Sequence, residues 1–217
     1  MTRFVEDGFD HWPQAAASLI GPLLAALPQA RRAGTRLTGN RDLALLLEAG
    51  GPVGVIAADA IGAGARPVRA ILFDKTAAAN WALGWHQDRT IAVRTHREVA
   101  GFGPWTIKGG MQHVAPPFDV LAGMVTLRVH LDPVPNDNAP LLVAPGSHHM
   151  GVIEEAAIAP AVARCGTHAC LAQAGDVWRL ATPILHASAR GNGTRRRVLH
   201  VDYAAGDLPG GLEWLGV

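Results

Sequence analysis

The tetrapeptide Trp85-His86-Gln87-Asp88 contains two side chains whose types and spacing suit metal chemistry. Its first two residues are the last two of residues 80–86, a segment that is predicted to be extended. In a strand, residues i and i+2 point to the same face, about 6.6 Å apart at ~3.3 Å rise per residue. His86 and Asp88 can therefore converge on one metal ion. A second histidine would complete a two-histidine, one-carboxylate facial triad, which leaves open positions on a ferrous ion for substrate chemistry.

The candidate second histidine is His186, which comes late in an apolar segment after a Gly175-Asp176 turn. Metal ligands in jelly rolls commonly come from two strands that are distant in sequence and adjacent in space. A lone histidine on an apolar strand is more often a core residue than a ligand, so spacing alone leaves both interpretations open. His130 and His200 are also expected to face inward, and either is an alternative ligand.

Three arginines open the last long predicted strand, residues 195–203. Alternation places Arg196 and His200 on one face of this strand and Arg197 on the other. An arginine that points into a β-barrel needs a partner, because an unpaired buried charge is very costly. A bound dicarboxylate would supply it through charge-assisted hydrogen bonds of about 1.5–3 kcal/mol each.

The elements that position these side chains are predicted to be mainly strands. From residue 67 onward, short β-rich segments alternate with glycine and proline turns, which favours a sandwich or jelly roll. The predicted strands are residues 68–73, 80–86, 124–131, 141–143, 177–180, 184–187 and 197–203. We expect one domain over 1–217, with a jelly-roll core over 67–204, a helical layer over 1–66 packed on its outside and a tail over 205–217.

Three helices are predicted in the N-terminal layer. The first covers residues 10–28, with Asp10 as its N-cap and a break or kink at Pro22. The second begins after an Asn40 cap and ends at Leu47. The third begins at Pro52 and buries a stripe of apolar residues, namely Val53, Ile56, Ala57, Ala60 and Ile61. Between the first two, Arg31, Arg32 and Arg36 are expected in a solvated loop rather than a phosphate site.

Residues 94–118 are expected to be a long loop, and a loop of this length in a compact domain is usually functional or mobile. It would either form a lid or substrate wall or cover the barrel mouth with aromatic residues. Its notable side chains are His96, Phe102, Trp105, Lys108 and His113. Cys165 and Cys170 are too few for a disulfide framework, and we expect Cys170 to be buried.

Composition excludes several functional classes for these 217 residues. A formal net charge of +1 gives no electrostatic footprint for nucleic acid. The longest apolar run, residues 15–26, is too short for a bilayer, and the first residues are acidic where a secretory signal would be basic. We therefore expect a cytoplasmic protein without a membrane or nucleic-acid partner.

Several stretches together resemble the phytanoyl-CoA dioxygenase family of iron(II)/2-oxoglutarate oxygenases. The resemblance covers roughly residues 68–204, about two-thirds of the chain. It is carried by Ile71-Leu72-Phe73-Asp74-Lys75-Thr76, Asn80-Trp81, Trp85-His86-Gln87-Asp88, residues 124–132, Asn138-Ala139-Pro140-Leu141, Pro145-Gly146-Ser147-His148, Gly175-Asp176, His186-Ala187-Ser188 and Arg196-Arg197-Val198-Leu199.

The resemblance implies a double-stranded β-helix whose ferrous ion is held by His86, Asp88 and His186. Arg196 would bind the distal carboxylate of 2-oxoglutarate, with Arg197 as the rival. Residues at family positions that often contact the co-substrate or face the site are Gln87, Ser188 and Arg128.

The activity implied is oxidation of a small molecule by O2 and 2-oxoglutarate, with release of succinate and CO2. Asp88 favours hydroxylation or a related oxidation, because a halogenase variant would carry a small residue there. The family's longer inserts are missing, which disfavours a bulky CoA thioester. Two alternatives stay open: a cupin-like metalloenzyme without 2-oxoglutarate, suggested by Gly175-Asp176 followed by His186, and a ligand-binding jelly roll without turnover.

Overall fold

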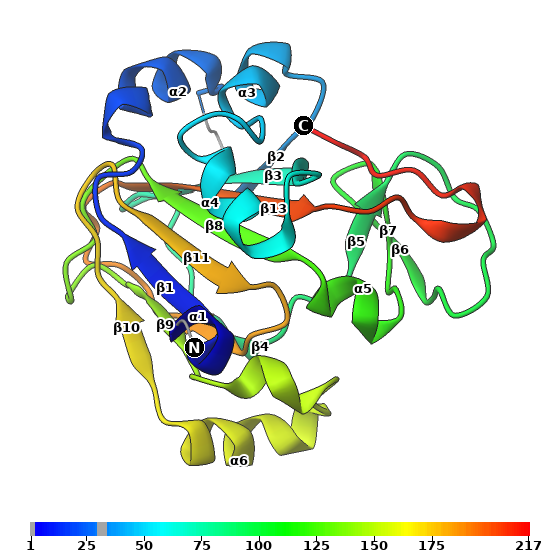
Figure 1. Cartoon of the computed structure of the whole chain (residues 1–217). Coiled ribbons are helices and arrows are strands. Elements are labelled where there is room, and N and C mark those ends of the chain that lie inside the picture. The colour runs from blue at the N-terminus through cyan, green and yellow to red at the C-terminus, as the bar shows by residue number, and fades with distance from the viewer. Residues whose placement is uncertain (1–2, 30–33) are drawn as a thin grey trace.

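A computed structural model describes residues 3–29 and 34–217, which form three antiparallel sheets (Figure 1). The large sheet has the order β1-β11-β8-β13-β3-β2, the second β10-β9-β12-β4 and the third β5-β7-β6. The strands are β1 (Phe9–Trp12), β2 (Gly34–Leu37), β3 (Arg66–Lys75), β4 (Leu83–His86), β5 (Ile91–Val93), β6 (Trp105–Lys108), β7 (Met111–Val114), β8 (Val125–His130), β9 (Leu141–Val143), β10 (His168–Cys170), β11 (Val177–Ala181), β12 (His186–Ser188) and β13 (Arg196–Ala204). The prediction of a mainly β jelly roll is confirmed.

Helices form a smaller part of the structure. They are α1 (Arg3–Asp7), α2 (Ile20–Ala26), α3 (Arg41–Leu46), α4 (Gly54–Ile61), α5 (Phe118–Ala122) and α6 (Glu155–Cys165), with 3-10 turns at Ala17–Leu19, Ser147–Met150 and Pro209–Gly211. In the described part of the chain, no helix is both long enough and apolar enough to span a bilayer. Cys170 is buried, as the sequence predicts, whereas Cys165, expected in a loop, is the last residue of α6.

The central strands of the large sheet are covered on both faces. In β8, Leu127 and Val129 join the apolar cluster beneath the helices, whereas Arg128 points to the opposite face and into a pocket. In β13, Leu199 likewise joins the apolar cluster and His200 lines the pocket. Because side chains alternate along a strand, one sheet can carry a core on one face and a polar site on the other.

Helices α2, α3 and α4 lie together against the apolar face of the large sheet (Figure 1). The predicted N-cap at Asn40 is confirmed, since its side chain accepts a 3.0 Å hydrogen bond from the Leu43 amide. The third helix begins at Gly54 rather than at Pro52, and Ala60 in its predicted buried stripe is exposed.

The predicted helix over residues 10–28 is wrong in its first half. Residues 9–12 form β1, which pairs with β11 at one edge of the large sheet. Asp10 is not a helix cap, because its carboxylate accepts two hydrogen bonds from Arg179, at 3.0 and 2.6 Å. Pro22 causes no break, because it occupies the first turn of α2, where the amides lack intrahelical acceptors.

The opposite edge of the large sheet also comes from the predicted helical layer. Residues 34–37 form β2, which pairs with β3. Arg36 in this strand lines the pocket, so its placement in a solvated loop is corrected. Arg31 and Arg32, which the same prediction covered, lie outside the described residues.

The expected loop over residues 94–118 contains a β-hairpin, and its last residue begins α5. Strands β6 and β7 pair across a Gly109-Gly110 turn, and β5 pairs with β7 to complete the third sheet. Phe102 is buried in the apolar core of this region with Trp105 packed against it, and neither lines the pocket. Lys108, at the end of β6, does line it.

We expect Leu127→Ala to lower the free energy of unfolding by about 2–5 kcal/mol, because Leu127 is fully buried between sheet and helices and its truncation leaves a cavity. Urea unfolding followed by circular dichroism measures this loss. Leu45→Ala is the control, since Leu45 is 57% exposed and its truncation should cost less than about 0.5 kcal/mol. Equal losses in the two variants would contradict this packing arrangement.

Candidate metal centre and co-substrate pocket

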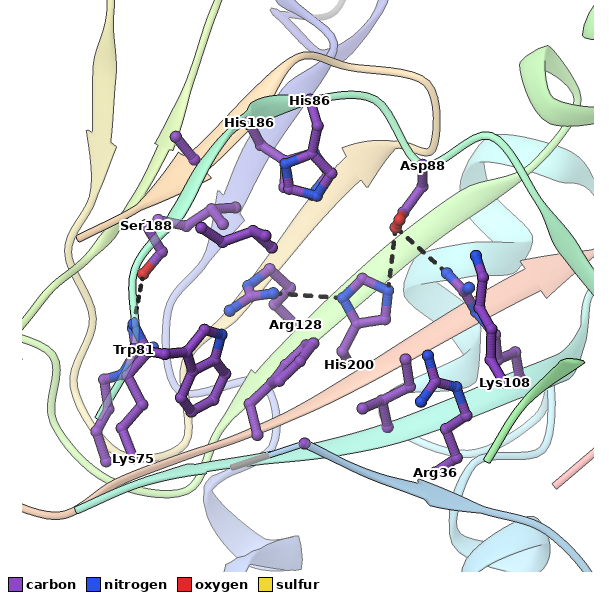
Figure 2. Close-up of a pocket in the computed structure, with 18 residues that line it drawn as sticks. Arg36, Lys75, Trp81, His86, Asp88, Lys108, Arg128, His186, Ser188 and His200 are labelled. Carbon is purple, nitrogen blue, oxygen red and sulfur yellow. Dashed lines mark hydrogen bonds and ion pairs between the residues drawn. The ribbon is translucent and has the colours of Figure 1, made fainter. Parts of the chain in front are cut away.

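Neighbouring strands β4 and β12 bring His86 and His186 together. The two histidines are directly paired across the strands, and their ring centroids are 4.3 Å apart. Asp88 follows β4 and completes the group, with one ligand atom of each residue within 4.8 Å of the others. The three residues that the family resemblance implies as iron ligands therefore lie at one place, at the edge of a shared pocket (Figure 2).

Hydrogen bonds orient both imidazoles for metal binding. Nδ1 of His86 lies 2.7 Å from the Gly84 carbonyl oxygen, and Nδ1 of His186 lies 2.9 Å from that of Ile184. A carbonyl oxygen only accepts, so each Nδ1 carries the proton and each Nε2 offers its lone pair. Burial lowers the pKa of His186 to about 4, which keeps it neutral near pH 7. The donor set fits a ferrous ion.

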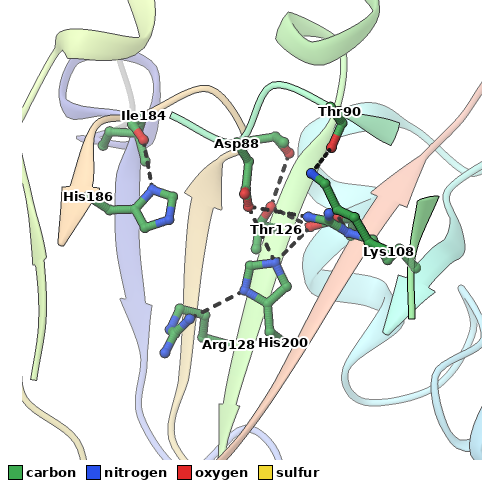
Figure 3. A network of polar contacts seen from close by, with 11 residues as sticks. Asp88, Thr90, Lys108, Thr126, Arg128, Ile184, His186 and His200 are labelled. Atoms are coloured by element: carbon green, nitrogen blue, oxygen red, sulfur yellow. Dashed lines mark hydrogen bonds and ion pairs between the residues drawn. The ribbon is translucent and has the colours of Figure 1, made fainter. Parts of the chain in front are cut away.

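The carboxylate of Asp88 is held in its charged form. Burial alone would raise its pKa, but the Arg69 guanidinium and the surrounding histidines hold it well below the usual range. Arg69 donates a 3.2 Å hydrogen bond to Asp88, and His200 Nε2 lies 3.7 Å from the same carboxylate (Figure 3). Arg69 is itself fixed by a 2.5 Å hydrogen bond to the buried Asp202.

A cavity of about 220 Å³ lies between the large sheet and the β4–β12 pair. Among the described residues its lining has six cationic side chains and one carboxylate, that of Asp88. The cations are Arg36, Arg69, Lys75, Lys108, Arg128 and Arg196. A pocket with this excess of positive charge is suited to negatively charged ligands.

One end of the cavity is formed by Arg196, Lys75 and Ser188. Arg196 is 2% exposed and donates a hydrogen bond to the Ala139 carbonyl, while its Nε has no partner within the described ranges. Lys75 Nζ donates to Ser188 Oγ at 3.1 Å and to the Ala189 carbonyl at 2.6 Å. These partners are neutral, so the two cations lack a counter-charge from them.

The pKa values of the cationic side chains at this end of the cavity are lowered by burial and by the neighbouring positive charges. Burial, with Arg128 nearby, lowers the pKa of Arg196 to about 10, and burial lowers that of Arg128 to about 10 as well. Burial followed by the charges of Arg196 and Arg128 lowers the pKa of Lys75 to about 8. A bound dianion would relieve this repulsion, which makes a diacid a suitable ligand.

Two residues from the predicted co-substrate set point elsewhere. Gln87 is buried. Its side-chain amide donates hydrogen bonds to the carbonyls of Gly151 and Pro183 and accepts one from the Ile153 amide, and all three bonds lie outside this cavity. The expectation that it contacts the co-substrate has no support in this placement. Arg197, the rival of Arg196, pairs in bidentate fashion with Asp132 and does not line the cavity.

Of the other residues that were expected to face inward, two line the cavity and one does not. Arg128 faces the cavity and donates to His200 Nδ1 at 3.3 Å. His200 also lines it and contacts Asp88, whereas His130 is buried but not part of the lining. Sequence reasoning assigned no site role to Arg69 or Lys75, although Arg69 lies in the predicted strand 68–73 and both residues belong to β3.

The family profile described as "Phytanoyl-CoA dioxygenase (PhyH)" matches residues 56–208. The chain belongs to the phytanoyl-CoA dioxygenase family. The resemblance noted in the sequence is thereby confirmed, and with it the expectation of an enzyme of the iron- and 2-oxoglutarate-dependent class. No curated protein sequence matches the chain.

Solved structures share the PhyH-type fold at low sequence identity. EctD from S. alaskensis in its apoform has a TM-score of 0.65 at 20% identity over 99% of this chain and 79% of its own. The epimerase SnoN in complex with Fe3+, alpha ketoglutarate and nogalamycin RO has a TM-score of 0.64 at 17% identity, covering 96% and 88%. HygX from Streptomyces hygroscopicus with nickel and 2-oxoglutarate bound has 0.60 at 16%, covering 93% and 84%.

Proposed function

We propose that this PhyH-family chain is an iron(II)/2-oxoglutarate-dependent oxygenase that hydroxylates a small molecule. The observation that carries the proposal is the convergence of His86, Asp88 and His186, with both Nε2 atoms available, beside a cationic pocket. SnoN with alpha ketoglutarate and HygX with 2-oxoglutarate, which share the fold, support it. The partners are a small-molecule substrate and O2, and the cytoplasm is the location.

The residues of the chain have separate tasks in this proposal. His86, Asp88 and His186 hold the metal from one side, and the backbone carbonyls behind the two histidines keep the rings in position. Arg196 and Lys75 bind the distal carboxylate of 2-oxoglutarate, with Ser188 beside them. When bound, iron(II) and 2-oxoglutarate supply the oxidising power that inserts an oxygen atom of O2 into a C–H bond, and succinate and CO2 are released.

Anaerobic addition of iron(II) and 2-oxoglutarate to the protein tests the proposal. We expect a weak visible charge-transfer band that requires both additions, and succinate release once O2 and a substrate are present. Iron binding without a band, at saturating 2-oxoglutarate, would instead favour a metalloenzyme that does not use this diacid. Screening candidate small molecules for stimulated succinate release would then identify substrates.

The affinity for 2-oxoglutarate should fall as pH rises above 8. Lys75 has a pKa lowered to about 8 by burial and by Arg196 and Arg128, so its ammonium is present below that pH and lost above it. Loss of one charge-assisted hydrogen bond should weaken binding by about tenfold. Titrating the charge-transfer band with 2-oxoglutarate at pH 7 and pH 9 measures this change.

Lys75→Met is the control for this titration. Its 2-oxoglutarate affinity should be low at both pH values and should change little between them. A pH dependence in Lys75→Met equal to that of the wild type would assign the titration to another group.

A further inference from the structure

A second group of cations lies across the cavity from Lys75 and Ser188 (Figure 2). Arg36 comes from the edge strand β2, and Lys108 comes from the end of β6 in the third sheet. Both line the same cavity as the candidate metal ligands. We call Arg36 and Lys108 the mouth cations.

The mouth cations have no carboxylate of their own among the described residues. Arg36 Nε is buried and has no hydrogen-bond partner within residues 3–29 and 34–217. Lys108 Nζ donates to the neutral Thr90 hydroxyl at 3.0 Å. The nearby Arg69 differs from them, because it is paired with Asp88 and Asp202. In the part of the chain that the structure describes, Arg36 and Lys108 are therefore the cations at this end that form no ion pair with a carboxylate.

Burial and like charge act on both side chains. The pKa of Arg36 is lowered by burial and then by the charge of Arg69, and the pKa of Lys108 is lowered by the same two causes in the same order, while the Asp88 carboxylate offsets part of the shift in each. An anion bound between them would offset both effects, because an opposite charge favours the protonated form. The charges of Arg36 and Lys108 therefore favour an anion at the end of the cavity that both side chains line.

Two separate elements converge to form this end of the cavity. A Cβ atom at Gly109, in the turn after Lys108, would lie 3.6 Å from Cδ of Arg36 and 3.9 Å from its NH1. The Arg36 side chain therefore packs along the β6–β7 turn. Arg36 also lies outside residues 56–208, the part that matches the family profile, so its contribution is a feature of this chain beyond that match.

We propose that the primary substrate is a small organic anion whose negative group binds between Arg36 and Lys108. Its reacting carbon then faces the His86, Asp88 and His186 group, while 2-oxoglutarate occupies the opposite end beside Lys75. The inference rests on the proposed function, since it takes one end of the cavity as the co-substrate site.

Calorimetry on the anaerobic protein loaded with iron(II) and 2-oxoglutarate tests this assignment. The probes are matched pairs with and without charge: benzoate and benzamide, N-acetylglycine and its amide, and glycerol phosphate and glycerol. We expect the anionic member of at least one pair to bind at least about tenfold more tightly than its neutral partner. The preferred pair distinguishes a carboxylate from a phosphate ester.

Variants connect the preference to the two side chains. Arg36→Met and Lys108→Met should each weaken binding of the preferred anion by about tenfold or more, and Arg36→Lys should retain most of it. Both methionine variants should still form the 2-oxoglutarate charge-transfer band, with 2-oxoglutarate affinity within about twofold of wild type. Arg41→Met is the matched control, because Arg41 is exposed and lies outside the cavity lining.

The outcomes separate this inference from the proposed function. Equal binding of charged and neutral partners, no binding of any of the three anions, or an anion preference unchanged in both methionine variants would overturn it while leaving the band intact. A missing band in the wild type, together with an anion preference that depends on Arg36 and Lys108, would contradict the proposed function and support the anion site.

Discussion

The His86→Ala variant is expected to lose iron(II) affinity by at least about a hundredfold, and with it the charge-transfer band formed with 2-oxoglutarate. His86 supplies one of three ligand atoms that lie within 4.8 Å of one another, and the remaining pair cannot enclose the ion from three directions. The side chain is only partly buried and lies on the edge strand β4, so its removal should leave the fold intact. Equilibrium iron binding under anaerobic conditions measures the effect.

The matched control for His86→Ala is His96→Ala. His96 is an exposed histidine that pairs with Glu98 and does not line the cavity. Iron affinity in this variant should equal that of the wild type. If His86→Ala instead keeps its iron affinity within about threefold, the ion binds elsewhere, and the buried histidines 130 and 200 become the candidates.

The Arg196→Met variant is expected to need about a hundredfold more 2-oxoglutarate, while iron binding changes little. Arg196 is buried beside Lys75, and its Nε has no partner among the described residues, so it is positioned to donate to a carboxylate. Two charge-assisted hydrogen bonds contribute about 3 kcal/mol together, which corresponds to about a hundredfold in affinity. Titration of the charge-transfer band with 2-oxoglutarate gives the value.

Arg197→Met provides the neighbouring control. Arg197 is paired with Asp132 outside the cavity, so its loss should affect stability modestly and leave 2-oxoglutarate affinity unchanged. A larger effect in Arg197→Met than in Arg196→Met would reverse the assignment. Equal loss of iron and 2-oxoglutarate in Arg196→Met would show that the arginine supports the metal centre rather than the diacid.

Strand alternation placed Arg196 and Arg197 on opposite faces of β13, but it did not say which face lines the pocket, so Arg197 stayed the rival until the pairing of β13 was known. The same rule applied to Gln87 would have placed it opposite His86 and Asp88, which is where its three hydrogen bonds lie. The pairing of His86 with His186 could not be derived in this way. It depends on the contact between β4 and β12, which are 100 residues apart, and only the family resemblance pointed to it.

Tertiary pairing explains the errors in the N-terminal region. Residues 9–12 have an apolar spacing that also suits a helix, but β11 offers a strand edge and Arg179 a partner for Asp10.

The hairpin at residues 105–114 does have a local sequence signal. Gly109-Gly110 is a two-residue turn with positive φ at both positions, which is typical of a β-hairpin. Recognising it would have placed Lys108 at a strand end. The role of Arg36 could not have been found locally, because it depends on β2 pairing with β3.

The most direct test of the central claim is anomalous diffraction at the iron edge from crystals prepared anaerobically with iron(II) and 2-oxoglutarate. We predict one strong peak within coordination distance of His86 Nε2, a carboxylate oxygen of Asp88 and His186 Nε2, with the diacid extending from it toward Arg196. A peak at His130 or at any other group, or a diacid bound away from the metal, would contradict the account.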